Sequence, residues 1–265
     1  MQLKGSIAVV VGGATGIGAG VCRALSAKGA AVQVCDRDYA GAQAVADELE
    51  RLGGAAAAYA VDVVDEKSID AAEAAIRSRH GRVDLLFANA GVISLKPFEQ
   101  TTADDWRWIL DINVVGCVSC VRAFLPAMRA QHSASRVVVT SSVAALRTPE
   151  MTGQTMYMAS KAAQLGFCNA LRTELAGTNV GLSVIFPGPV ASQLRQKSEV
   201  SRPGAIQLEV PKAVLGGGGS MPPEEAGERI VAAVVKEQAY ITTHPGDGPL
   251  VRQAQDAIMA AFEPS

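Results

Sequence analysis

The fold is decided by the stretch Ile7-Ala-Val-Val-Val-Gly-Gly-Ala-Thr-Gly-Ile-Gly18. Its β-branched first half is typical of a buried strand, and a helical pattern follows the glycines as far as Lys28. A strand, a glycine turn and a helix N-terminus form a cradle for phosphate, because backbone N–H groups can approach a pyrophosphate and the helix dipole favours an anion. The stretch therefore predicts a dinucleotide-binding α/β fold.

Asp36 ends the second expected strand, residues 31–35. A carboxylate at this point can accept hydrogen bonds from the ribose hydroxyls of adenosine and repels a 2′-phosphate, so it favours NAD over NADP. Arg37 beside it leaves the choice of cofactor open. The third strand, residues 56–61, ends at Asp62, which can hydrogen-bond the adenine amino group or simply cap the next helix.

Further strands are expected at residues 83–87, 136–140, 181–186 and 240–243, separated by helical patterns. The alternation predicts one Rossmann-type domain over residues 1–265, an α/β fold with a doubly wound parallel sheet of about seven strands and helices on both faces. The pattern is irregular over residues 193–220, and a loop of this length in a compact domain is commonly functional. We expect it to be a mobile lid over the substrate.

Composition argues against several classes of function. The net charge of −2 gives no electrostatic reason to expect nucleic acid or an acidic membrane as a partner, and no apolar run looks long enough to span a bilayer. Five cysteines and no secretion signal favour reduced thiols in a cytoplasmic protein. The three histidines are far apart in the sequence, so we expect no metal site.

Tyr157 and Lys161 are spaced to share one face of a helix that runs to about residue 177. A free phenol titrates near ~10, and a cation a few ångströms away stabilises the phenolate and lowers that pKa. A tyrosine tuned in this way can give a proton to a carbonyl or take one from an alcohol. In isolation such a pair is usually an ordinary surface contact, so its meaning depends on the rest of the chain.

Two further features of the sequence support a functional role for Tyr157 and Lys161. Asn113 lies in a long helical pattern, residues 103–129, where a buried amide needs partners and could anchor a water leading to a lysine. Asn89-Ala90-Gly91 follows the fourth strand, and its small residues allow the chain to pass close to a cofactor.

Together these residues resemble the classical short-chain dehydrogenase/reductase family over essentially the whole chain. The motifs that carry the resemblance are Gly12-x3-Gly16-x-Gly18, Asn89-Ala90-Gly91, Asn113, Ser142, Tyr157-x3-Lys161 and Pro187-Gly188. The resemblance implies a catalytic tetrad of Asn113, Ser142, Tyr157 and Lys161. In it Tyr157 is the acid/base, Ser142 hydrogen-bonds the substrate oxygen, Lys161 binds the nicotinamide ribose and lowers the tyrosine pKa, and Asn113 holds the water of a proton relay.

The resemblance also extends the expected binding sites. Val190 is expected to offer its backbone to the nicotinamide carboxamide, and Ser192 stands where the family usually has Thr. The full cofactor-binding set is expected to be Gly12, Thr15, Gly16, Ile17, Gly18, Asp36, Arg37, Asp62, Val63, Asn89, Ala90, Gly91, Tyr157, Lys161, Pro187, Gly188, Val190 and Ser192. The substrate pocket is expected to be lined by Val92, Ile93, Ser94, Ser142, Met151, Gln154, Met156, Tyr157 and Leu194, most of which are apolar and suit a neutral hydrophobic substrate.

The sequence departs from the family pattern at three points. Val11 replaces a common Thr before the first glycine, which should remove one brace to the Asn89 segment. Ala88 replaces the first Asn of the usual Asn-Asn-Ala-Gly. The interval from serine to tyrosine is slightly long, which leaves Ser141 as an alternative to Ser142. All four tetrad positions are nevertheless filled.

The sequence therefore predicts an NAD-dependent oxidoreductase that interconverts a secondary alcohol and a ketone. An NADP-dependent biosynthetic ketoreductase and a non-catalytic NAD-binding scaffold or sensor remain the alternatives. A homo-oligomer, tetramer or dimer, is expected from the helices that contain Asn113 and Tyr157. These helices carry more apolar residues than one core face requires, namely Cys117, Val121, Phe124, Ala163, Phe167 and Ala170.

Overall fold

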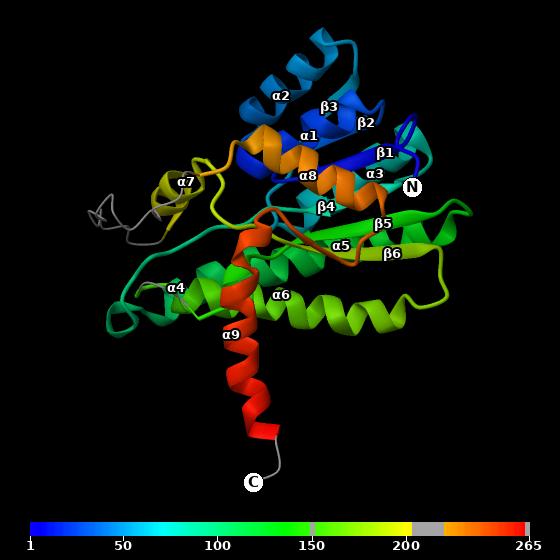
Figure 1. Cartoon of the computed structure of the whole chain (residues 1–265). Helices are drawn as coiled ribbons and strands as arrows, with labels where there is room; N and C mark the ends of the chain where they lie inside the picture. Colours follow the sequence, from blue (N-terminus) through cyan, green and yellow to red (C-terminus); the bar gives the residue numbers. More distant parts are fainter. Residues whose placement is uncertain (149–151, 203–219, 263–265) are drawn as a thin grey trace.

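The computed structural model describes residues 1–148, 152–202 and 220–262, and within them seven parallel strands form one sheet (Figure 1). The order across the sheet is β3-β2-β1-β4-β5-β6-β7. The bounds are β1 (Ile7–Val11), β2 (Ala31–Asp36), β3 (Ala55–Ala60), β4 (Leu85–Ala88), β5 (Ser135–Thr140), β6 (Val180–Phe186) and β7 (Tyr240–Thr242). The predicted doubly wound α/β fold is confirmed.

Helices cover both faces of the sheet. The α-helices of the described residues are α1 (Gly16–Ala27), α2 (Tyr39–Arg51), α3 (Glu66–His80), α4 (Ala103–Leu110), α5 (Gly116–Ala130), α6 (Thr155–Glu174), α7 (Leu194–Ser201), α8 (Pro223–Val235) and α9 (Gly248–Met259). Alternate residues of β1 point to opposite faces, so Val10 packs with α1, α2 and α8, whereas Val9 packs with α3, α5 and α6. Each face therefore has its own apolar core.

The strand order reverses between β1 and β4. After β3 the chain returns past β1, and Ala8 pairs in parallel with Leu85. In open α/β sheets a crevice opens at such a switch point, beyond the carboxyl ends of the strands. The ends of β1 and β4 therefore determine where a ligand can bind.

The predicted helix over residues 103–129 is interrupted by a π turn, Asp111–Val115, with Asn113 in its middle. The whole segment Ala103–Ala130 is long and apolar enough to cross a membrane by length and composition, which corrects the expectation that no run in the chain has this character. Core helices have the same composition, and this segment buries Ile109, Asn113 and Phe124. Its packing in the fold accounts for its apolar character.

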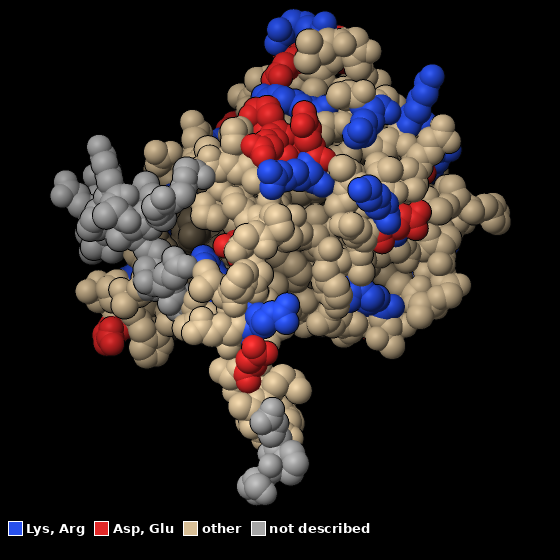
Figure 2. All heavy atoms as spheres, viewed as in Figure 1, with Lys and Arg blue, Asp and Glu red and all other residues tan. Residues whose placement is uncertain are grey.

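Helices α1 and α8 cross with their backbones in contact. A Cβ atom added at Gly20 would lie 1.9 Å from the carbonyl oxygen of Pro223, and one added at Gly227 would lie 2.2 Å from that of Gly20. Only glycine permits this approach at either position. On the face in Figure 2 acidic and basic side chains are interspersed, and Arg23 of α1 pairs with Glu48 of α2 and Glu224 of α8.

Two segments in the C-terminal part of the chain lie outside the sheet and its packed helices. The irregular segment 193–220 contains helix α7, and its residues 203–219 lie outside the described part of the chain. Helix α9 extends away from the sheet (Figure 1) and has no buried residue.

Candidate active site

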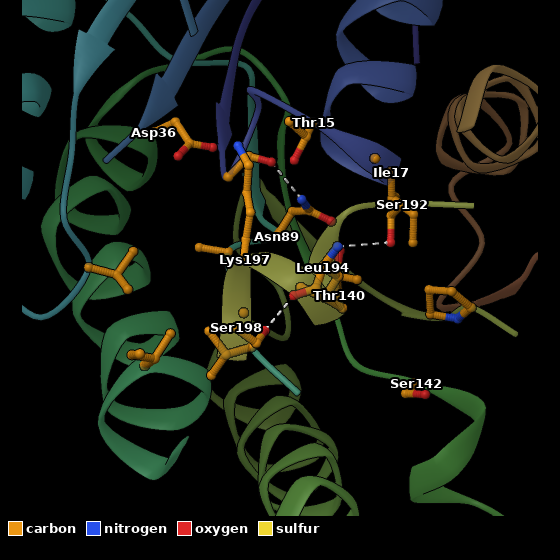
Figure 3. Close-up of a pocket in the computed structure, with 18 of the residues that line it drawn as sticks. Thr15, Ile17, Asp36, Asn89, Thr140, Ser142, Ser192, Leu194, Lys197 and Ser198 are labelled. Atoms are coloured by element: carbon orange, nitrogen blue, oxygen red, sulfur yellow. Dashed lines mark hydrogen bonds between the residues drawn. The ribbon is translucent and has the colours of Figure 1, made fainter. Parts of the chain in front are cut away.

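A cavity lies at the carboxyl ends of the strands around the switch point (Figure 3). The turns after β1, β2 and β4, the start of α6 and helix α7 surround it. Its lining comprises Gly12, Thr15, Gly16, Ile17, Asp36, Arg37, Asp38, Val61, Asp62, Val63, Asn89, Ala90, Gly91, Val92, Ile112, Thr140, Ser141, Ser142, Tyr157, Lys161, Pro187, Gly188, Val190, Ser192, Leu194, Lys197 and Ser198. Every predicted cofactor-binding residue except Gly18 is in this set.

The glycine turn is shaped by close backbone approaches. Gly12 has φ of 81°, and a Cβ there would lie 2.7 Å from the Cα of Ala90. A Cβ at Gly18 would lie 1.9 Å from the Gly12 carbonyl oxygen, so Gly18 is needed to close the turn and does not line the cavity. The Asn89 side-chain amide donates to the same oxygen at 2.9 Å, which braces the turn although Val11 has no hydroxyl.

The first turn of α1 is open to an anion. Side chains cap the N-termini of α2, α3 and α4, where Asp38, Asp65 and Thr102 accept backbone N–H bonds, but Thr15 at the start of α1 makes no such bond. The first turn of α1 also contains no acidic residue. Uncapped N–H groups and the helix dipole suit a pyrophosphate, so the residues present fit a dinucleotide.

Asp36 is held in place at the adenosine end of the cavity. One carboxylate oxygen accepts from the Ala14 N–H at 3.1 Å and the other from the Asp38 N–H at 3.0 Å. Asp62 also lines the cavity, and its carboxylate accepts the Val64 N–H. The cap of the next helix is Asp65, so the alternative reading of Asp62 as that cap is wrong.

Ser142, Tyr157 and Lys161 meet at the opposite end. The Lys161 Nζ lies 5.7 Å from the centroid of the Tyr157 ring. Burial raises the pKa of Tyr157, and a hydrogen bond with Ser142 lowers it. The predicted lowering of this pKa by Lys161 is not seen: the pKa is raised by desolvation of the phenolate, and only Ser142 acts in the opposite sense. Ser141 is the less suitable serine, since its hydroxyl donates to the Lys161 carbonyl oxygen.

Lys161 is buried among hydrogen-bond acceptors. Its Nζ donates to the Thr140 carbonyl oxygen and to the Gln164 Oε1, each at 3.0 Å. Burial lowers the pKa of Lys161 to about 8. An ammonium group has three donors, so one remains for a ligand in the cavity.

Asn113 lies behind the cavity and does not line it. Its side-chain oxygen accepts the Val92 N–H, and its amide donates to the Val92 carbonyl and to the Ser160 hydroxyl. Its backbone carbonyl accepts from the Gln164 Nε2 at 2.7 Å. The Gln164 side chain reaches both groups and so joins Asn113 to Lys161 directly. The water expected on Asn113 stays a prediction.

The burial of Lys161 has a consequence for stability. The pKa of about 8 in the folded chain lies below the ordinary 10.5, so between these values Lys161 binds more protons in the unfolded chain and contributes a rise in the free energy of unfolding with pH. The buried cysteines, whose pKa values are raised, contribute a fall above pH ~8.5, so the contribution of Lys161 is measured as the difference from a variant that lacks it. Below pH 8 the buried charge costs up to about 3 kcal/mol. We expect Lys161→Met to remove this rise, as urea unfolding from pH 6 to 10.5 can measure. The matched variant Lys67→Met changes an exposed lysine, and the same pH dependence there would contradict burial as the cause.

The structure places only some of the residues of the predicted substrate pocket at this cavity. Val92, Ser142, Tyr157 and Leu194 line the cavity, but Ile93, Ser94, Gln154 and Met156 do not, and Met151 lies outside the described residues. Ser94 is buried next to Arg202 of the segment after α7, 3.3 Å from its guanidinium. Met156 is fully buried against Val92 and Ile109. A loop position in the sequence does not show which side chains a neighbouring helix will cover.

Sequence reasoning missed several lining residues, namely Asp38, Val61, Ile112, Thr140, Lys197 and Ser198. Lys197 of α7 pairs with Asp38 at 2.8 Å across the cavity, and the Ser198 hydroxyl accepts the Ile93 N–H at 3.0 Å (Figure 3 shows both α7 residues beside the cavity). Only the tertiary structure brings α7 over the cavity. No local motif marks these positions.

Half of the residues cited for an oligomer are core residues. Cys117, Val121 and Phe124 are buried against the sheet, so they do not form a surface for another copy. Ala163 and Ala170 of α6 are exposed, and Phe167 is partly buried. The helical pattern overestimated the free apolar surface, because α5 packs between the sheet and its neighbours α3 and α6.

Known proteins share this fold and these motifs. A family model described as short chain dehydrogenase matches residues 6–202. The chain is 29% identical to 3-oxoacyl-(acyl-carrier-protein) reductase of Thermotoga maritima over 91% of this chain and 95% of that one. It is 31% identical to cyclopentanol dehydrogenase of a Comamonas species over 91% and 94%. A short chain dehydrogenase/reductase from Burkholderia phymatum in complex with NAD has a TM-score of 0.88 and 28% identity, with 100% and 98% of the chains covered.

Fold, cavity and relatives define an oxidoreductase that acts on CH–OH groups. The chain belongs to the short-chain dehydrogenase/reductase family.

Proposed function

We propose that the protein is an NAD-dependent dehydrogenase that interconverts a secondary alcohol and a ketone. The observation that carries the choice of NAD is the Asp36 carboxylate, fixed by two backbone N–H groups at the adenosine end of the cavity. The glycine turn from Gly12 to Gly18 contains no basic residue that would favour a 2′-phosphate. The side chains at the Tyr157 end support the alcohol chemistry.

The residues at that end divide the chemistry among them. Bound NAD supplies the hydride acceptor. Ser142 and Tyr157 hydrogen-bond the alcohol oxygen. Burial disfavours the Tyr157 phenolate, and the positive charges of Lys161 and of bound NAD would offset this effect. The phenolate then takes the hydroxyl proton as the carbon loses its hydride, so that alcohol becomes ketone. Lys161 holds positive charge beside the phenolate and offers its third N–H to the ribose. Val92, Ile112 and Leu194 supply an apolar wall, which suits a neutral hydrophobic substrate.

Asp36 provides a direct test of cofactor choice. Replacing Asp36 by Ser should weaken NADH binding about 10- to 100-fold, because hydrogen bonds to a charged group contribute roughly 1.5–3 kcal/mol. NADPH binding should strengthen in the same variant, since a repelling charge is removed. Fluorescence titration of both reduced cofactors measures both effects.

The control for this titration is Asp47→Ser, which removes the same charge from the exposed side of α2. It should leave both affinities within about twofold of the original protein, the small effect expected of a surface substitution. Tighter binding of NADPH than of NADH by the unmodified protein would overturn the proposal.

An NADP-dependent ketoreductase is the second candidate, because Arg37 and Lys197 also line the cavity near Asp36. Either cation could pair with a 2′-phosphate. Absorbance assays of NAD and NADP reduction on a panel of secondary alcohols, from small aliphatic to aryl and steroidal, distinguish the two candidates. If no alcohol in the panel is oxidised while NADH still binds, the result would favour a non-catalytic scaffold.

Three further expectations remain proposals. Helix α7 acts as the described part of a lid, held by Lys197 to Asp38 and by Ser198 to the Ile93 backbone. The chain works as one domain in a homo-oligomer that uses the exposed small residues of α6, which light scattering on the purified protein can check. The cytoplasm is its expected location.

A further inference from the structure

One buried side chain beside the proposed tetrad has no role in the chemistry described so far. Gln164 follows Lys161 by one turn of α6 and is 1% exposed. Its Oε1 accepts from the Lys161 Nζ at 3.0 Å, and its Nε2 donates to the Asn113 carbonyl at 2.7 Å. A single amide thus joins the ammonium group to the π turn between α4 and α5.

The two ends of this amide suit two different neighbours. A buried ammonium group is stable only where acceptors replace water, and Gln164 supplies one of the two acceptors that the structure gives Lys161. The other end of the amide is anchored on a backbone carbonyl, so the side chain is not free to turn away. An uncharged carboxamide can hold an ammonium group in this way without exchanging a proton with it.

We infer that Gln164 is a positioning residue for the reaction: its side-chain amide fixes the Lys161 ammonium group beside Tyr157 and stabilises its charged form. A residue that only fills space at this point would need neither hydrogen bond. The cofactor-free protein can be tested directly, and only the activity measurements rest on the proposed function.

The other titratable groups near Lys161 determine the background for this test. On α6 the neighbour is Tyr157, whose pKa is raised by burial. On α5 it is Cys117, whose thiol has its pKa raised to about 11 by burial and hydrogen-bonds Gln164. An unfolded thiol ionises near ~8.5, so Cys117 lowers the unfolding free energy over the pH range in which Lys161 raises it, and all variants are compared in a Cys117→Ala background. From the strand side, the Thr140 carbonyl contributes an uncharged acceptor.

The first experiment follows urea unfolding of the cofactor-free protein from pH 6 to 10.5. In Gln164→Met the ammonium group loses an acceptor while the side chain keeps its size. The contribution of Lys161 to the unfolding free energy rises with pH from about pH 8 in the original protein. In this variant the rise should therefore begin about one pH unit lower. In Gln164→Glu a carboxylate faces the ammonium group, and the rise should move about one unit higher.

Two further variants separate positioning from packing. In a Lys161→Met background, Gln164→Met should cause no pH-dependent change, because the group on which it acts is gone. Leu171→Ala, two turns further along α6 in the apolar core, should lower stability equally at every pH, because leucine does not titrate. If Gln164→Met behaves like Leu171→Ala, with uniform loss and no shift along the pH axis, Gln164 is a packing residue and the inference is wrong.

Kinetics provide the second readout. With the cation less well placed or neutralised, the pH of half-maximal kcat/KM for alcohol oxidation should rise in both Gln164→Met and Gln164→Glu, by about one unit, with NADH binding nearly unchanged. An unchanged pH profile in both variants would overturn the inference. If the unmodified protein oxidises no alcohol, the proposed function fails, and the unfolding experiment still decides the role of Gln164.

Discussion

Replacing Tyr157 by Phe should lower kcat for alcohol oxidation by about 10²- to 10⁴-fold, the range that general acid–base catalysis contributes. The substitution removes one oxygen atom, and with it the group that takes the hydroxyl proton. The ring remains, so the packing of the cavity and the place of Lys161 should be preserved. Single-turnover reduction of NAD with a preferred alcohol measures the chemical step.

The controls concern binding and side-chain type. NADH should bind the Tyr157→Phe variant within a few-fold of the original affinity, because the phenolic oxygen is not needed for the glycine turn or Asp36. Tyr39→Phe changes an exposed tyrosine on α2 and should leave the rate unchanged. Alcohol oxidation at a comparable rate in the Tyr157→Phe variant would remove this residue from the chemistry.

A second large effect is expected on stability, at the crossing of α1 and α8. Gly20→Ala should destabilise the fold by about 3 kcal/mol, the upper part of the usual cost of overpacking. The added methyl group would meet the Pro223 carbonyl at 1.9 Å, and backbone cannot move aside as a flexible side chain can. The helices must separate, which exposes the core that α8 forms with the sheet. The denaturant midpoint in urea measures the loss.

A glycine-to-alanine substitution at an uncrowded helix position should instead increase the stability of the protein. Gly166 lies on the exposed side of α6, and a Cβ added there meets no atom within 4 Å. Gly166→Ala should therefore stabilise the protein by up to about 1 kcal/mol through helix propensity. If Gly20→Ala is as well tolerated as Gly166→Ala, the close crossing of α1 and α8 is wrong.

Local patterns were enough to predict the sheet and most of the cofactor cavity. The strand, turn and helix from Ile7 onward are specified by neighbouring residues, and Asp36 and Asp62 follow directly from where strands end. The carboxyl ends of parallel strands meet at one edge, so residues far apart in sequence could be assigned to one site. The spacing of Tyr157 and Lys161 worked for the same reason, since a helix fixes which residues share a face.

What the sequence did not reveal depends on contacts between distant segments. The π turn around Asn113 has the same apolar pattern as a continuous helix, so the sequence did not reveal it. The role of Gln164 depends on its hydrogen bond to this turn, which no local pattern shows. Arg202, just after α7, donates to the Ser94 hydroxyl, and α7 brings Lys197 to Asp38; no spacing in the sequence encodes these contacts. Cys117 and Phe124 were expected at a surface because an apolar helix pattern does not state how many neighbours will cover it.

The reversal of strand order between β1 and β4 also bears on how the chain folds. Each strand of the described sheet pairs in parallel, so no neighbouring strands can be joined by a tight hairpin. The contact between β1 and β4 at the centre of the sheet, here called the central seam, joins residues 77 apart in the sequence, as in the hydrogen bond from Asn89 to Gly12. The chain loses the entropy of closing this long loop before the contacts that stabilise the loop have formed, so folding is slow. The glycine turn that would hold a dinucleotide lies at the central seam, so a chain in which β1 and β4 have not yet paired has no site for the cofactor. A dinucleotide that binds only after this pairing would shift the folding equilibrium towards the native state.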